Sequence, residues 1–170
     1  MAKKQTTSQA PRKLTIGLLQ PQLVGRNNTV RALSWKNPFG TAMLHDKEET
    51  RVWATEYRGW VLICLSKQSY TTIQQRNICG DKQYERLQKA IEGDPTKQMT
   101  GVAIAIGYLT DCKPMSEDTK EADRAFVEYQ PGLFRHIYSE VHRIEPFEWK
   151  GTQGWKTISA DDLKKIKIIE

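Results

Sequence analysis

The chain contains 170 residues, 38% of them hydrophobic and 27% charged, a composition typical of one globular domain. It has no run of about 18 apolar residues, which excludes a membrane-spanning helix. Its first residues are basic and polar, without the apolar stretch of a signal peptide, and we therefore expect a cytoplasmic protein that makes no membrane contact.

The net charge of +6 is concentrated near the N-terminus. Residues 1–45 contain seven lysines and arginines and no acid, whereas the remaining residues carry 19 cations and 20 acids. A basic segment attracts polyanions such as RNA without sequence preference, and it can equally serve as a solvated tail. We expect residues 1–13 to form a disordered basic tail and residues 14–170 to form a single domain.

The first half of this domain shows several strand patterns. Residues 14–24 hold an interrupted apolar run and are expected to form an added strand or arm. Residues 30–35 and 49–53 read as short strands, with a short helix between them at 39–44. Residues 60–65 are continuously apolar, which predicts a strand with both faces covered.

Residues 68–100 differ from their surroundings because they are polar and rich in Gln, Thr and Lys. Tyr84, Leu87 and Ile91 lie at positions i, i+3 and i+7, the spacing of an apolar stripe on a helix. The segment is expected to be a polar helical insertion. It is either a lid over the barrel or a packed connecting helix.

The second half predicts long strands and a C-terminal helix. Residues 101–109 alternate large and small side chains, which should place on one strand face Val102, Ile104, Ile106 and Tyr108. A short helix is expected at 121–127 and a strand at 134–144 that Pro146 ends, followed by a hairpin spanning 147–158. Ser159 should cap a short C-terminal helix, and the alternative is a final strand at 167–169. These elements predict an α+β fold, a partly open β-barrel of about six strands with two or three packed helices.

Two motif blocks place polar side chains beside these strands. The first block reads Leu-Ser-Trp-Lys-Asn-Pro at 33–38 and Glu-Thr-Arg at 49–51, followed by Trp53, by Tyr-Arg-Gly at 57–59 and by Ser-Lys at 66–67. The second block has Pro146 and then Lys-Gly-Thr-Gln-Gly-Trp at 150–155. In type and order these motifs resemble the ASCH domain family of the PUA-like β-barrel superfamily, over residues 32–67 and 101–158.

One departure from the family pattern concerns its lysine. The motif Gly-x-Lys-x-x-Glu-x-Arg should place that lysine at position 46, where this chain has Asp46, and Leu44 stands in place of the glycine. Either Lys47 fills the role from one residue later, or the lysine function is lost.

The resemblance implies a basic cleft that binds RNA or a modified nucleoside. Arg51 has a planar fork of donors that suits a phosphate or carboxylate, Lys36 and Lys67 supply point charges, and the Asn37 amide can read a base edge. Trp35, Trp53 and Trp155 offer stacking surfaces, although any one of them can equally belong to the core. The full set of expected binding residues is Lys36, Asn37, Arg51, Arg58, Ser66, Lys67, Gln153 and Trp155.

The alternative is a hydrolase that uses the same cleft, because some ASCH proteins are amidohydrolases on acetylated cytidine and others are ribonucleases. Its catalytic residues would be Lys47 and Glu49, with Glu49 acting as a base on water. The threonine that replaces the motif glutamate in the amidohydrolases is absent here, and Thr50 is one position away.

A third possibility is a protein-interaction module that contacts a protein partner through the tail or residues 68–100. No cofactor and no metal site are expected, because the three cysteines form no CxxC pair and His136 and His142 are too far apart along one strand to share an ion.

Overall fold

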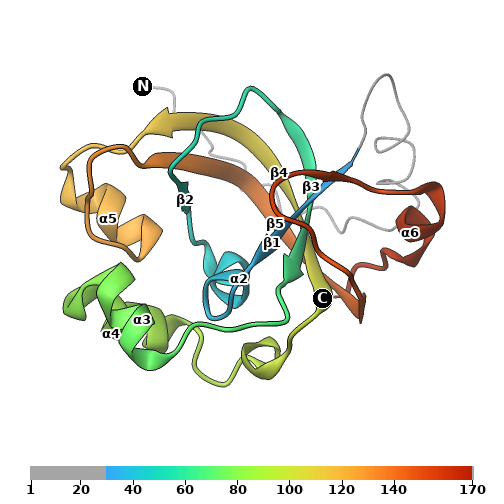
Figure 1. Ribbon diagram of the computed structural model, residues 1–170, viewed down its shortest axis with the longest axis horizontal. Helices are drawn as coiled ribbons and strands as arrows, with labels where there is room; N and C mark the ends of the chain where they lie inside the picture. The colour runs from blue at the N-terminus through green and yellow to red at the C-terminus, as the bar shows by residue number, and fades with distance from the viewer. Residues whose placement is uncertain (1–29, 170) are drawn as a thin grey trace, which may run out of the picture.

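The computed structural model describes residues 30–169 as one sheet that curls into half a barrel, with helices packed against it (Figure 1). Six strands run in the order β2-β5-β4-β3-β1-β6. Their bounds are β1 (Arg31–Trp35), β2 (Glu49–Arg51), β3 (Gly59–Leu65), β4 (Val102–Pro114), β5 (Phe134–Glu148) and β6 (Lys156–Thr157). The expected partly open α+β barrel is confirmed. The tail at 1–13 and the arm at 14–24 lie outside the described residues.

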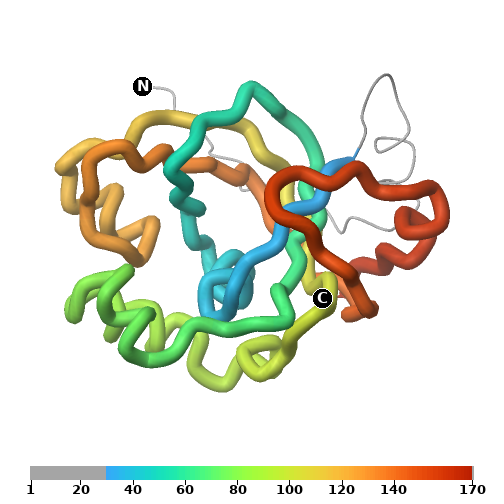
Figure 2. The backbone as a smooth tube through the Cα atoms, viewed as in Figure 1, coloured from blue at the N-terminus to red at the C-terminus, as the bar shows by residue number. Residues whose placement is uncertain are grey.

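The two long strands β4 and β5 form the back of the half-barrel and run side by side around its curve (Figure 2). β1 pairs with β3 in parallel, and the other pairs are antiparallel. The register between β4 and β5 shifts at three places, and such irregularities bend the strands that contain them. The short strands β2 and β6 are the two edges of the sheet, and they do not pair with each other.

One register shift overturns the prediction for the faces of β4. Ile104 packs in the inner core with the helices, whereas Ile106 packs in the outer core with the C-terminal segment. The reason is a bulge between Ala103 and Ala105, which turns the following residues to the opposite face. Pro146 lies on β5 opposite this bulge, at a position where the strand needs no N–H donor. The strand therefore continues through Pro146 to Glu148, and the prediction that Pro146 ends it is wrong.

The described residues contain five α-helices, more than the two or three expected. Their bounds are α2 (Phe39–Ala42), α3 (Thr72–Cys79), α4 (Asp81–Ala90), α5 (Thr119–Ala125) and α6 (Ala160–Lys165), with 3-10 turns η1 (Met43–His45) and η2 (Pro95–Gln98). The segment 68–100 supplies two of them because Gly80, with φ +77°, separates α3 from α4. None of the helices in residues 30–169 has the length and apolar composition needed to cross a membrane.

Two apolar cores lie on the two faces of the sheet. The strand β3 serves both: Val61, Ile63 and Leu65 face the inner core, while alternate residues face the outer core. The predicted helix stripe is confirmed, since Leu87 and Ile91 are fully buried in the inner core. Helix α2 also packs into this inner core, inside the curl of the sheet (Figure 1).

The C-terminal segment differs from the predicted hairpin. β6 pairs with β1, so that Thr157 lies opposite Arg31, and it does not pair with residues 147–150. The edge of β1 that faces away from β3 is open, and β6 pairs with its first two residues, Arg31 and Ala32. Ser159 caps α6 by accepting a hydrogen bond from the backbone N–H of Asp162, as predicted.

A buried amide joins α2 to the turn η2. The Asn37 Nδ2 donates to the carbonyls of Thr96 and Met99 at 2.9 and 3.1 Å. Its Oδ1 accepts from both the backbone N–H and the hydroxyl of Thr41, at 3.1 and 3.0 Å. One side chain therefore satisfies polar groups from two segments almost sixty residues apart in sequence.

We expect Asn37→Ala to lower the free energy of unfolding by about 3 kcal/mol, because it leaves several buried polar groups without partners. Urea denaturation of wild type and variant measures the change. Asn77→Ala, at an exposed asparagine of α3, is the matched control and should cost under about 0.5 kcal/mol. Equal stability of the two variants would contradict the role given to Asn37.

Candidate functional site

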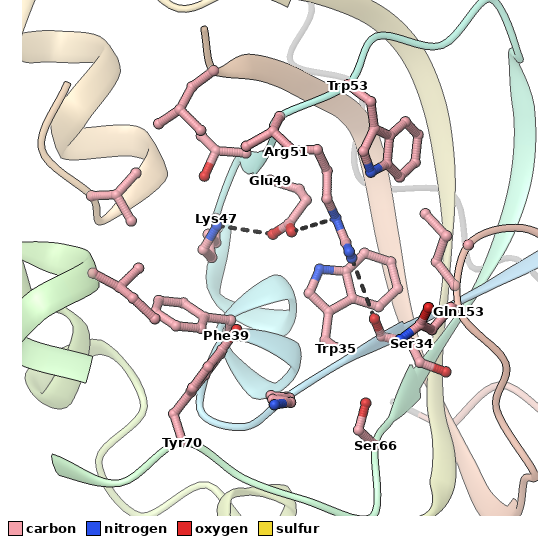
Figure 3. A pocket seen from close by; sticks show the side chains of 18 of the residues that line it. Ser34, Trp35, Phe39, Lys47, Glu49, Arg51, Trp53, Ser66, Tyr70 and Gln153 are labelled. Carbon is pink, nitrogen blue, oxygen red and sulfur yellow. Dashed lines mark hydrogen bonds and ion pairs between the residues drawn. The ribbon is translucent and has the colours of Figure 1, made fainter. Parts of the chain in front are cut away.

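A cavity of about 760 Å³ opens in the gap of the half-barrel, between the free part of the β1 edge and β2 (Figure 3). Its walls come from 33–36, from 47–53, from α3 and from the loop 152–154. The expected site residues that line it are Lys36, Lys47, Glu49, Arg51, Ser66 and Gln153. Residues of two distant motif blocks therefore meet at one site.

Four expected residues do not line the cavity. Asn37 is 2% exposed and is held by the hydrogen bonds that join α2 to η2, so it cannot read a base. Arg58 forms an ion pair with Asp111 at 3.5 Å, and Lys67 is exposed to solvent. Trp155 packs behind the rim, with its ring 5.9 Å from the ring of Trp53.

The local backbone explains why Lys47 reaches the cavity. Asp46 ends η1 in the left-handed conformation, with φ of 59°, and its side chain is exposed. The chain then turns back, the Lys47 N–H donates to Ala42 O, and the Lys47 side chain is only 1% exposed. The Lys47 side chain therefore lines the cavity, whereas that of Asp46 does not.

Three charged side chains form a chain of ion pairs across the cavity wall (Figure 3). The Lys47 Nζ lies 3.0 Å from Glu49 Oε2, and the Arg51 Nε lies 2.9 Å from Glu49 Oε1. Glu49 and Arg51 are on the same side of β2 because strand side chains alternate. The carboxylate is thus shared between two cations, which keeps the wall net positive.

Burial alone would raise the pKa of Glu49, but the charges of Lys47 and Arg51 outweigh it and hold the pKa below its ordinary value of 4.5. The Lys47 hydrogen bond lowers the pKa further. The indole N–H of Trp35 faces the same carboxylate and adds to this effect, although it forms no well-aligned hydrogen bond. Glu49 is therefore ionised at neutral pH.

Arg51 bridges the gap of the half-barrel. Its Nη2 donates to the carbonyl of Ser34 on β1 at 3.4 Å, while the residue itself belongs to β2. Its guanidinium carbon lies 5.1 Å from the ring centre of Trp35 and 5.8 Å from that of Trp53. Contact with the two aromatic rings fixes the plane of the guanidinium, and its Nε and Nη2 are held by Glu49 and Ser34.

Lys36 is a cation without a carboxylate partner in the part of the chain that the structure describes. Its Nζ lies 5.1 Å from the ring centre of Tyr70, and both residues line the cavity. Tyr70 also packs edge-on against Phe39, another wall residue. Tyr70 and Phe39 were not predicted as site residues. Phe39 stands beside the first motif, whereas nothing in the local sequence marks Tyr70.

His136 does not line the cavity but contacts Trp53, which does. It is fully buried, its Nε2 lies 3.0 Å from Trp53 O, and its ring packs edge-on against the Trp53 ring. Burial lowers the pKa of His136, which favours the neutral ring. The histidine therefore positions Trp53, and it lies opposite Glu49 in the β2–β5 register.

Comparisons with known proteins assign no family to the chain. No protein-family model matches the sequence, and no curated protein matches it. The resemblance to ASCH domains therefore depends on the motif residues described above, and function has to be argued from the chemistry of the cavity.

We expect Glu49→Gln to lower the free energy of unfolding at pH 7 by about 2–4 kcal/mol, because it leaves Lys47 buried without a counter-charge. Glu49 has a lower pKa folded than unfolded, so its stabilisation is complete above about pH 4.5 and is lost as the pH falls through the folded value. The difference between wild type and variant should therefore shrink in acid.

Urea denaturation at a series of pH values from 7 to about 3 measures this difference. Glu56→Gln, at an exposed acid close to the same strand, is the control and should change stability little at any pH. A difference that stays constant with pH would show that Glu49 does not titrate as argued.

Proposed function

We propose that the cavity binds one nucleoside unit, either an unpaired nucleotide of RNA or a modified nucleoside, in an ASCH-like domain. The observation that carries the proposal is the combination of aromatic walls and incompletely neutralised positive charge in one cavity. Its volume of about 760 Å³ lies within the usual range for small-ligand sites and accommodates a base with its sugar.

The lining residues match the needs of such a ligand. Unpaired bases bind proteins by stacking on aromatic rings, and the partly exposed rings in the walls are Trp53 and Tyr70. Trp35 is only 2% exposed, and the Arg51 guanidinium lies against the rings of Trp35 and Trp53. The hydroxyl of Ser66 and the amide of Gln153 can donate and accept hydrogen bonds at base edges. A phosphate of the ligand would be bound by Lys36 and by the open edge of Arg51.

The hydrolase alternative is less well supported by the geometry. Glu49 is held ionised by two cations, which makes it a weak base. The Lys47 Nζ is engaged by Glu49 Oε2 at 3.0 Å and by Glu48 O at 2.9 Å, so both contacts hold it away from a substrate. Thr50 lines the cavity, which favours a hydroxyl nucleophile, but no hydrogen bond joins it to Lys47 within residues 30–169.

We expect Lys36→Ala and Arg51→Ala to weaken binding of short single-stranded RNA by about tenfold each, since each removes a charge-assisted contact. Lys36→Ala is the cleaner substitution because it breaks no ion pair. Fluorescence titration of labelled oligonucleotides at two salt concentrations measures affinity, and the RNA is examined afterwards for cleavage.

Lys89→Ala is the matched control, because Lys89 is an exposed lysine on α4 that does not line the cavity. If the control weakens binding as much as Lys36→Ala, the affinity is diffuse electrostatics and the cavity is not the site. Cleavage that Glu49→Gln abolishes while binding persists would establish the hydrolase. If no cavity substitution alters RNA binding, the same variants are titrated with free modified nucleosides, and absence of binding there rejects the proposal.

A further inference from the structure

Arg31 differs from the other arginines of residues 30–169 in having no carboxylate partner. Each of the others forms an ion pair, namely Arg51, Arg58, Arg76, Arg86, Arg124, Arg135 and Arg143. A guanidinium is always charged and has five donors, so one without a counter-ion is open to an external anion.

The Arg31 guanidinium lies against two aromatic rings. Its carbon is 4.5 Å from the ring centre of Tyr57 and 5.8 Å from that of Trp155. The two rings are 5.2 Å apart, and the Tyr57 hydroxyl is fixed by donating to Trp60 O at 2.7 Å. Arg31 is thus held in place by contacts with two aromatic rings, and within residues 30–169 no carboxylate pairs with it.

Stacking on an aromatic ring does not itself require an unpaired arginine. Arg76 lies over the ring of Tyr84 at 4.3 Å and still forms an ion pair with Asp81 at 2.9 Å. The missing carboxylate at Arg31 is therefore a separate feature, which a purely structural stacking role does not explain.

This group is continuous with the cavity. Trp155 packs edge-on against Trp53, which lines the cavity, and it follows directly on the rim residues 152–154. Arg31 and Leu33 are two residues apart on β1 and so share one face, and Leu33 also lines the cavity.

We propose that Arg31, Tyr57 and Trp155 form a second subsite, which binds the phosphate that links the nucleotide in the cavity to its neighbour. Arg31 donates two hydrogen bonds to the phosphate, and the exposed parts of the two rings contact the neighbouring sugar and base. This inference rests on the proposed function and specifies it: the ligand is a single-stranded polynucleotide and not a free nucleoside.

The test compares a ribonucleoside with single-stranded oligoribonucleotides of two and six residues, using the full-length wild type, Arg31→Ala and Arg31→Lys. Arg31→Ala should weaken binding of the six-residue RNA about tenfold and leave nucleoside binding unchanged. The slope of log affinity against log salt should fall in magnitude by about 0.7, as expected for one lost phosphate contact on a single strand. Arg31→Lys should restore most of the slope and part of the affinity.

Arg76→Ala is the matched control, since Arg76 also stacks on a tyrosine, and it should leave RNA affinity unchanged. The subsite is rejected if Arg31→Ala has no effect on the six-residue RNA, if it weakens the nucleoside equally, or if Arg76→Ala weakens RNA to the same extent. If Lys36→Ala and Arg51→Ala weaken RNA binding while Arg31→Ala does not, only the second subsite fails. If none of the three variants changes RNA binding, both the second subsite and RNA binding by the cavity are rejected, and the titration with free modified nucleosides then decides the proposed function.

Discussion

The arrangement of the cavity depends on the shared carboxylate of Glu49. A buried carboxylate has to be paired, and here its two oxygens are held by Lys47 and Arg51. Lys47 lies two residues before β2, and Arg51 is the last residue of that strand. Lys47 is anchored beneath α2, and Arg51 reaches the Ser34 carbonyl on β1. Through these two cations, one anion connects α2, β1 and β2. β1 and β2 border the gap in the barrel and share no backbone hydrogen bonds with each other.

The sequence predicted most strands and part of the site because those features are local. β1, β2 and β3 have apolar or alternating patterns, and the expected cavity residues Lys36, Glu49 and Arg51 lie on or beside them. The two-faced burial of β3 follows from its unbroken apolar run. For these elements, which are three to seven residues long, the local pattern determines both the strand and the side that its polar neighbours occupy.

What the sequence did not predict depends on contacts between distant segments. The bulge near Ala103 inverts the faces of β4, and no residue type in that strand marks it. Asn37 looked like a binding residue, but its amide satisfies a turn that begins almost sixty residues later. Tyr70 joins the cavity wall from the polar segment that follows β3. Polar side chains near a strand end are equally suited to a ligand and to the protein's own backbone, and only tertiary structure decides between them.

The charge of the cavity distinguishes between its possible ligands. Three cations and one carboxylate line it, and the carboxylate stays ionised because its pKa is lowered. A neutral nucleoside would leave this positive charge uncompensated in a partly desolvated site, whereas a nucleotide would supply the missing anion. Arg31 resembles Lys36, since each lies against an aromatic ring and neither has a carboxylate partner within residues 30–169. Lys36 and Arg31 lie at opposite ends of the β1 region, one inside the cavity and one beside its rim, and the proposed polynucleotide ligand would contact both.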